Sequence, residues 1–348
     1  MLWNMAVVAA VAFAAALAAT GLAVRLLRAR AILDHPNDRS SHAIPVPRGG
    51  GLAVTAVVVV HWALVWLFDA TADGFVFTTA MPVLLLLTLA LAGLSWQDDR
   101  RGLSAGLRLA VQALCVGVAT LTTLSAPGQT FQGLLPAALD LTATAFLWLW
   151  FINLTNFMDG IDGITGTESA SIGLGVVVLA LAGAPLMMAA SGELPVYAAA
   201  LAASALGFLC WNWQPARIFL GDVGSIPLGF LLGWLVIEAA GAGLWAAAVL
   251  LPLYYLVDAT ITLLRRILRR ERITEAHRSH AFQAAARRFG AHAPVVLWII
   301  GLNVMLIGLA LLSVARPALS WLAVAAGVLL TLMLFLFFNR RDPAAVTP

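Results

Sequence analysis

The stretch MPVLLLLTLALAGLSWQDDRR, residues 81–101, joins a long apolar run to two carboxylates and two guanidinium groups. A helix crosses the hydrocarbon core of a bilayer with about 20 apolar residues, so the run predicts a membrane span that closes at Asp98 and Asp99. The whole chain shares this composition, since 62% of its 348 residues are hydrophobic and 11% are charged. So little charge does not cover an ordinary soluble surface, and we predict an all-α, polytopic integral membrane protein.

Apolar runs of this kind recur along the chain, and we predict about 11 transmembrane helices. Their expected boundaries are residues 2–27, 49–68, 75–96, 107–125, 137–154, 168–190, 195–211, 225–240, 243–264, 294–314 and 317–338. No internal repeat, disulfide framework or long linker divides the sequence. We therefore predict a single polytopic domain over residues 1–348.

The arginines set the expected orientation, because cytosolic loops retain basic residues while translocated loops lose them. All 20 basic residues are arginine, and with the N-terminus outside every loop arginine except Arg316 falls on the cytosolic side, as does the C-terminus. Because these arginines lie beside the spans, their predicted role is to orient the protein in the membrane, not to bind nucleic acid. The expected cytosolic loops lie near residues 28–48, 97–106, 155–167, 212–224 and 265–293.

Adjacent carboxylates at a membrane boundary are the first chemical signal. Asp98 and Asp99 repel each other and lose solvation there, so both stay ionised only beside a metal ion or a cationic partner. A solvated loop in which Asp99 pairs with Arg100 or Arg101 would also explain the pair if it stood alone.

The segment NLTNFMDGIDG, residues 153–163, brings a second polar cluster to the same face. Asn153, Asn156, Asp159 and Asp162 recur every three residues, so they share one face while the backbone stays helical. Magnesium prefers such oxygen ligands and takes only one or two protein carboxylates, with phosphates and water completing its shell. Helix capping would explain one Asn and one Gly, but not four polar residues in register.

Two more loops return polar groups to this face. RIFLGDVGS, residues 217–225, places Asp222 between glycines, where we predict a metal ligand and where helix capping is the plainer alternative. Arg39 and Arg48 flank a turn-rich segment that ends in three glycines, and guanidinium groups suit phosphate oxygens. A basic loop whose glycines let the second span pack closely explains that segment equally well.

The last cytosolic loop contains AHRSH, residues 276–280. His277 and His280 share a helical face and can bond a phosphate or a sugar hydroxyl, with Arg278 adding charge. Zinc would need more nitrogen or sulfur ligands, and a basic loop lying on anionic lipid would look similar. Asp258, two turns inside the run 243–264, is either a functional group or the partner of an arginine.

Taken together, four segments resemble, in order and spacing, the polyprenyl-phosphate N-acetylaminosugar-1-phosphate transferases, also called glycosyltransferase family 4. These segments are DDRRGLSAGLR, NLTNFMDGIDG, RIFLGDVGS and AHRSH. The resemblance covers nearly the whole chain. It implies ten or eleven membrane helices in a bacterial inner membrane, with the active site at the cytosolic face. It implies that Mg²⁺, or Mn²⁺ in its place, supports transfer of an aminosugar 1-phosphate from a UDP-N-acetylaminosugar to undecaprenyl phosphate with release of UMP. The short AHRSH loop is more similar to the branch that initiates O-antigen or other surface glycans.

The resemblance also implies residue roles. Asp98 and Asp99 match the catalytic acidic pair at the lipid phosphate, and Asn156 and Asp222 match the magnesium ligands. The substrate-binding candidates combine residues that match the family with others from the loop patterns above: Asp159, Asp162, Asn153, His277, Arg278, His280, Arg39, Arg48, Arg108 and Arg217. Arg48 and Arg108 stand where several relatives carry lysine, which departs from the family's pattern.

Three other interpretations compete with this one. A peptidoglycan-branch phospho-MurNAc-pentapeptide transferase would share most of the motifs. A secondary transporter would place polar groups near the bilayer midplane, often in a repeated half, and a non-catalytic lipid-binding scaffold would need no set of acidic sites. The residues identify neither the sugar nor the oligomeric state, for which a homodimer is one alternative.

Overall fold

The computed structural model of the chain describes residues 2–34, 44–72, 79–184, 193–271 and 278–340. Within this part, ten helices are long and apolar enough to cross a membrane. The predicted all-α, polytopic fold is confirmed. The orientation of the termini stays a prediction.

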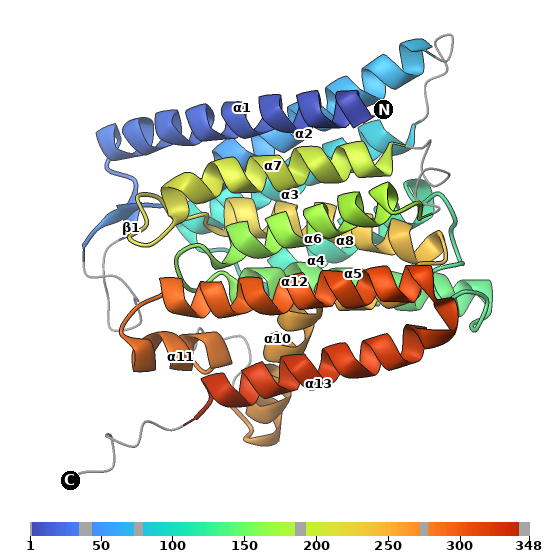
Figure 1. Cartoon of the computed structure of the whole chain (residues 1–348). Coiled ribbons are helices and arrows are strands. Elements are labelled where there is room, and N and C mark those ends of the chain that lie inside the picture. Colours follow the sequence, from blue (N-terminus) through green and yellow to red (C-terminus); the bar gives the residue numbers. More distant parts are fainter. Residues whose placement is uncertain (1, 35–43, 73–78, 185–192, 272–277, 341–348) are drawn as a thin grey trace.

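The long helices lie side by side in one bundle, with α1 along one edge and α13 along the other (Figure 1). The elements are α1 Leu2–Ala29, β1 Leu33–Asp34, β2 Val46–Pro47, α2 Gly51–Ala72, α3 Ala80–Arg101, α4 Ala105–Thr122, α5 Ala137–Met158, α6 Ile164–Leu181, α7 Leu194–Asn212, α8 Asp222–Gly241, α9 Trp245–Leu250, α10 Leu253–Leu268, α11 Ala281–Phe289, α12 Ala293–Ala315, η3 Pro317–Leu319 and α13 Ser320–Phe338. β1 and β2 form a short antiparallel pair. We call the end of the bundle beside β1 and α11, on the left in Figure 1, the site end.

The expected span 243–264 is divided, which is the main difference from the sequence analysis. The helix breaks between α9 and α10 at Leu251 and Pro252, because proline has no backbone N–H and crowds the preceding turn. α10 then runs steeply across the other helices (Figure 1). Neither piece is among the ten candidate spans, one fewer than the sequence predicted. Trp245 packs on Trp321 near the end opposite the site, with ring centroids 4.4 Å apart, and α10 leads back to α11.

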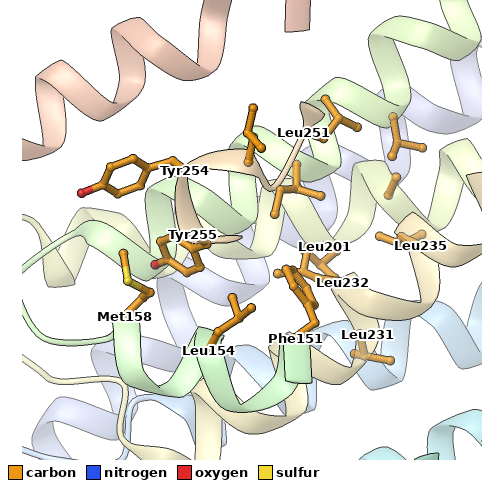
Figure 2. Packing of buried hydrophobic residues seen from close by; sticks show 14 of the residues in the cluster. Phe151, Leu154, Met158, Leu201, Leu231, Leu232, Leu235, Leu251, Tyr254 and Tyr255 are labelled. Carbon is orange, nitrogen blue, oxygen red and sulfur yellow. The ribbon is translucent and has the colours of Figure 1, made fainter. Parts of the chain in front are cut away.

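Helix α8 lies at the centre, because its glycines let neighbouring helices approach closely. A Cβ on Gly233 would lie 2.5 Å from Trp148 of α5, and one on Gly229 would lie 3.0 Å from Thr155. Trp148 stacks on Phe230 of α8 and donates its indole N–H to the Phe230 carbonyl, 2.9 Å away. Figure 2 shows apolar side chains of α5, α8 and α10 gathered in one buried cluster. This packing sets the end of α5 against the start of α8.

The three glycines at the start of α2, residues 49–51, serve chain packing. Gly49 and Gly50 donate their N–H groups to the Phe219 carbonyl at 3.1 and 2.8 Å, which ties the first loop to the segment before α8. A Cβ on Gly51 would lie 2.2 Å from the backbone of Gly224, so no larger residue fits there. The glycines of this segment therefore serve close packing of the second span, whereas the phosphate role of Arg48 stays a prediction.

Candidate active site

Three carboxylates from distant parts of the chain meet two arginines at the site end. Arg48 Nη2 lies 2.8 Å from Asp99 Oδ1 and 3.3 Å from Asp222 Oδ1. Arg108 Nη1 lies 2.8 Å from Asp98 Oδ2 and 3.6 Å from Asp222 Oδ2. Each arginine thus bridges Asp222, the first residue of α8, to one member of the acidic pair that ends α3. We call these five residues the carboxylate cluster.

Asp99 holds the start of α8. Its two oxygens accept the N–H groups of Asp222 and Val223 at 3.3 and 3.0 Å, which have no partner within the helix. A Cβ on Gly221 would lie 2.9 Å from Asp99 Oδ2, and Gly221 has φ +74°, so glycine is required there. With Arg48 also bound and only 4% of its side chain exposed, Asp99 positions Asp222.

The carboxylates of Asp98 and Asp222 differ in their hydrogen bonds, ion pairs and exposure to solvent. Asp98 Oδ1 accepts the Leu103 N–H at 2.6 Å and Oδ2 pairs with Arg108, so Asp98 closes the turn from α3 to α4. Its side chain is 8% exposed, whereas that of Asp222 is 16% exposed. Asp222 is the most accessible carboxylate of the cluster, and its side-chain contacts are with arginines.

Two neighbouring cavities lie at this end of the bundle, and Arg108 of the carboxylate cluster lines the larger one. The larger, of about 610 Å³, has polar groups near the end of α5 and apolar groups about three turns earlier on the same helix. Its lining includes Arg108, Asn153, Asn156, Asp159 and His280, then Phe146, Leu149, Trp150 and Leu263. The smaller, of about 530 Å³, is lined by Asp162, Phe219, Arg278, Arg287 and His292, among others. Gln283 of α11 lines both cavities, so they are adjacent.

The asparagines of α5 face the larger cavity. Asn156 Oδ1 accepts a hydrogen bond from Ser225 Oγ of α8 at 2.7 Å, which links α5 to the helix that Asp222 begins. Asn153 Nδ2 donates to Gln112 Oε1 of α4 at 2.9 Å. Gln112 was not singled out from the sequence, since nothing around it forms a motif.

The predicted stripe of four polar residues is wrong at its last member. Asn153, Asn156 and Asp159 line the larger cavity, but Asp162 lines the smaller one. The reason is that α5 ends at Met158, so the helical spacing that aligns the first residues no longer applies to the last.

Asp159 follows α5 directly and is half-buried. Burial raises the pKa of its carboxyl to about 7; a hydrogen bond from Thr165 opposes the rise, and the nearby Asp222 adds to it. Near neutral pH this carboxyl is therefore divided between its charged and neutral forms. A cation arriving at Asp222 would favour the charged form.

Asp162 joins two segments behind the smaller cavity. Its Oδ2 accepts the Ala216 N–H at 3.0 Å, and its own N–H donates to His292 Nδ1 at 3.2 Å. Gln214 Oε1 in turn accepts the N–H of His292 at 2.8 Å. His292 and Gln214 stand outside the recognised motifs and reach Asp162 only through folding, so nothing in the sequence marks them as part of the site.

Asp258 is fully buried, and its charged partner is a histidine, not the arginine that one of the two alternatives named. Its Oδ1 lies 3.2 Å from His280 Nδ1 and accepts the Ala281 N–H at 3.1 Å. Its Oδ2 accepts the Phe282 N–H at 3.2 Å and the Tyr254 hydroxyl at 3.0 Å. Asp258 therefore caps α11 and orients His280, which lines the larger cavity.

The remaining candidates fall into three groups. Arg278 lines the smaller cavity. Arg217 stacks over Trp211, with its guanidinium carbon 5.6 Å from the ring centroid, and lines neither cavity. Arg39 and His277 lie outside the described residues.

The donor set at Asp222 fits magnesium better than zinc. Within the described ranges no three His, Cys, Asp or Glu side chains gather closely enough to hold a metal by themselves, as zinc would require. Magnesium takes one or two carboxylates and completes its octahedron with phosphate and water. The side chain of Asp222 pairs with arginines. Ser225, one turn after Asp222 on α8, donates to Asn156 Oδ1. Asp222 and Asn156 together are a donor set of this kind.

Comparison with known proteins found a family model that matches part of the chain. Residues 80–240 match the family model "Glycosyl transferase family 4". That segment contains Asp98, Asp99, Asn156 and Asp222, whereas Asp258, His280 and His292 lie beyond it.

Three relatives illustrate the similarity. Decaprenyl-phosphate N-acetylglucosaminephosphotransferase of Mycobacterium tuberculosis (strain ATCC 25618 / H37Rv) is 31% identical over 230 residues, 63% of this chain and 56% of that protein. A probable undecaprenyl-phosphate N-acetylglucosaminyl 1-phosphate transferase of Bacillus subtilis (strain 168) is 28% identical over 71% of this chain and 68% of its own length. Phospho-N-acetylmuramoyl-pentapeptide-transferase of Rippkaea orientalis is 30% identical over 54% of this chain and 51% of its own. The chain thus spans little more than half the length of several curated relatives.

Proposed function

We propose that this chain, which belongs through residues 80–240 to the polyprenyl-phosphate aminosugar-1-phosphate transferase family, transfers an N-acetylaminosugar 1-phosphate from a UDP-sugar to undecaprenyl phosphate. The observation that carries the proposal is the carboxylate cluster, with its two arginines beside a cavity that is polar near the end of α5 and apolar deeper in the bundle. A reaction between a soluble diphosphate and a membrane-borne phosphate needs such a junction.

The larger cavity suits the lipid acceptor. Phe146, Leu149 and Trp150 offer an apolar wall to the first units of a polyprenyl chain, and Arg108 offers a cation to its phosphate. The smaller cavity suits the nucleotide sugar, because Arg278 and Arg287 can meet phosphate oxygens and Phe219 offers an aromatic ring. Since Gln283 lines both cavities, the two substrates would meet beside the larger one, which Arg108 of the carboxylate cluster lines.

The chemistry asks for positioning and charge neutralisation more than for proton transfer. An oxygen of the lipid phosphate attacks the β-phosphorus of the donor, and the bond from that phosphorus to the bridging oxygen breaks in line, its electron pair leaving on UMP. The acceptor is a phosphate monoester whose second pKa is about 6, so it is largely ionised at neutral pH. Asp98 then orients it through Arg108 instead of deprotonating it.

The arginines have a second task in this scheme. Arg48 and Arg108 both contact Asp222, and they can exchange that carboxylate for phosphate oxygens when the substrates enter. Magnesium, held by Asp222 and Asn156, would supply positive charge to the transferring group. A covalent aspartyl-phosphate route is the alternative mechanism, and it predicts exchange of labelled UMP into UDP-sugar without any lipid phosphate.

The finer assignments are proposals of the same kind. Relatives named for GlcNAc favour UDP-GlcNAc as the donor, and the short AHRSH loop favours a surface-glycan role over the peptidoglycan one. The site would face the cytosol from a bacterial inner membrane. A phospho-MurNAc-pentapeptide transferase is the second candidate, because proteins of that name also match.

A UMP-release assay tests the proposal. Purified protein in nanodiscs is supplied with UDP-GlcNAc, undecaprenyl phosphate and Mg²⁺, and other UDP-aminosugars are screened in parallel. Release should need all three components, and Asp222→Asn should abolish it while the protein remains folded. Arg217→Ala, which removes a cation at the same end of the bundle but outside both cavities, is the matched control. Release that continues in Asp222→Asn at ordinary magnesium would refute the assigned site.

A further inference from the structure

A carboxyl group that the proposed chemistry does not use lies inside the bundle. Glu168 of α6 and Asn303 of α12 are 1% and 2% exposed. Asn303 Nδ2 donates to Glu168 Oε2 at 2.7 Å. The other oxygen of each side chain, Glu168 Oε1 and Asn303 Oδ1, is also buried and has no hydrogen-bond partner.

This arrangement is unfavourable for an ionised carboxylate. A buried charge needs a cation or several donors to replace its lost hydration, and in the part of the chain that the structure describes no arginine or histidine lies within ion-pair distance of Glu168. Two buried acceptors without a donor add to the penalty. A single proton removes both difficulties.

We propose that Glu168 is a neutral carboxylic acid whose Oε1 hydroxyl donates to Asn303 Oδ1, so that acid and amide form a closed pair with two hydrogen bonds. The pair accounts for all four heteroatoms of the two side chains. Rotating the amide by 180° leads to the same conclusion, because two oxygens would then face each other at the 2.7 Å contact and one must carry a proton.

The position of the pair gives it a role behind the smaller cavity. α6 begins just after the loop that holds Asp159 and Asp162, and α12 begins just after His292. Asp162 and His292 join these helices at the site end, and the Glu168–Asn303 pair joins them again inside the bundle. Two contacts along the same helix pair prevent one helix from sliding past the other. Glu168 and Asn303 are therefore positioning residues for the cavity that, under the proposed function, takes the nucleotide sugar.

Infrared spectroscopy tests the proton directly. Wild-type protein at neutral pH should show the carbonyl stretch of a protonated carboxylic acid that is missing from Glu168→Gln and shifted in Asn303→Ala. Glu238→Gln is the matched control, because Glu238 is another buried glutamate, near the opposite end of the bundle, whose carboxylate accepts a backbone N–H from Ser125. Its spectrum should keep the Glu168 band. If the difference between wild type and Glu168→Gln shows only a carboxylate stretch, the neutral pair is refuted.

Rescue tests the positioning role. In Glu168→Gln the new amide places an N–H where the acid has its hydroxyl, so this variant should keep the wild-type Tm and donor affinity. Glu168→Ala and Asn303→Ala should lower the Tm and weaken UDP-sugar binding about tenfold, as loss of a buried hydrogen bond predicts. Donor binding by Asn303→Ala that equals wild type would overturn the positioning role.

The spectrum and the Tm require no substrate. They decide the neutral pair even if the proposed transferase activity is absent, and UMP release alone decides that activity.

Discussion

Removing the Asp99 carboxylate should weaken the proposed metal site at Asp222 without removing either of its proposed ligands. Asp99 accepts the N–H groups of Asp222 and Val223 at the start of α8 and pairs with Arg48. In Asp99→Ala these groups lose their acceptor, and the first turn of α8, which carries Asp222, is no longer held. Asp99→Asn keeps one oxygen and should show a smaller effect.

The magnitude follows from those contacts. A side chain that caps a helix N-terminus contributes about 0.5–2 kcal/mol, and hydrogen bonds to a charged acceptor contribute about 1.5–3 kcal/mol each. The ion pair between Arg48 and Asp99 adds little, because 39% of the Arg48 side chain is exposed and solvent screens its charge. We take about 2 kcal/mol for ordering the first turn. Metal binding must supply this ordering in the variant, which corresponds to about 30-fold weaker affinity.

Mn²⁺ binding followed by electron paramagnetic resonance measures this affinity without substrate, and a magnesium titration of UMP release measures it with substrate. In Asp99→Ala the ion concentration at half saturation should rise about 30-fold, while the rate at saturating ion largely recovers. Asp98→Asn should instead lose rate at every magnesium concentration. The reasoning is refuted if Asp99→Ala binds Mn²⁺ as wild type does, or if excess ion never restores its rate.

Three further predictions rest on single contacts. Gly221→Ala should reproduce the metal defect of Asp99→Ala in the same Mn²⁺ titration, because its Cβ would lie 2.9 Å from Asp99 Oδ2; normal binding would contradict this. Folding raises the pKa of Asp159 to about 7. At pH values between the ordinary aspartate pKa and this raised pKa, the folded state therefore keeps a proton that the unfolded state has released. Wild type should therefore lose Tm relative to Asp159→Asn as pH rises from about 4 to 7, and a pH-independent difference would show that Asp159 keeps an ordinary pKa. Arg108→Ala should raise the KM for undecaprenyl phosphate about tenfold or more through loss of a phosphate contact, whereas Arg217→Ala should leave it unchanged; equal effects would argue against an acceptor site at Arg108.

The sequence alone determined the class of fold and the residues that meet at one end of it. A bilayer demands apolar helices of about 20 residues, and each run is visible without any knowledge of its neighbours. Because successive spans alternate direction, Asp98, Asp99, Asn156 and Asp222 had to return to one face. Pro252 was equally visible, but only the packed bundle shows that α10 leaves the direction of the other helices there.

The tertiary structure decided which partner each polar group has. Asp99 caps α8, Asp258 caps α11 and holds His280, and Asp162 turns to His292 because α5 ends four residues before it. Each of these contacts, except that between the neighbouring helices α10 and α11, joins segments far apart in the chain. Hydropathy is a property of a single segment, whereas a hydrogen bond depends on where two segments end and how closely their helices pack. The division of labour between Asp98 and Asp99, adjacent in sequence and identical in chemistry, was decided by that packing alone.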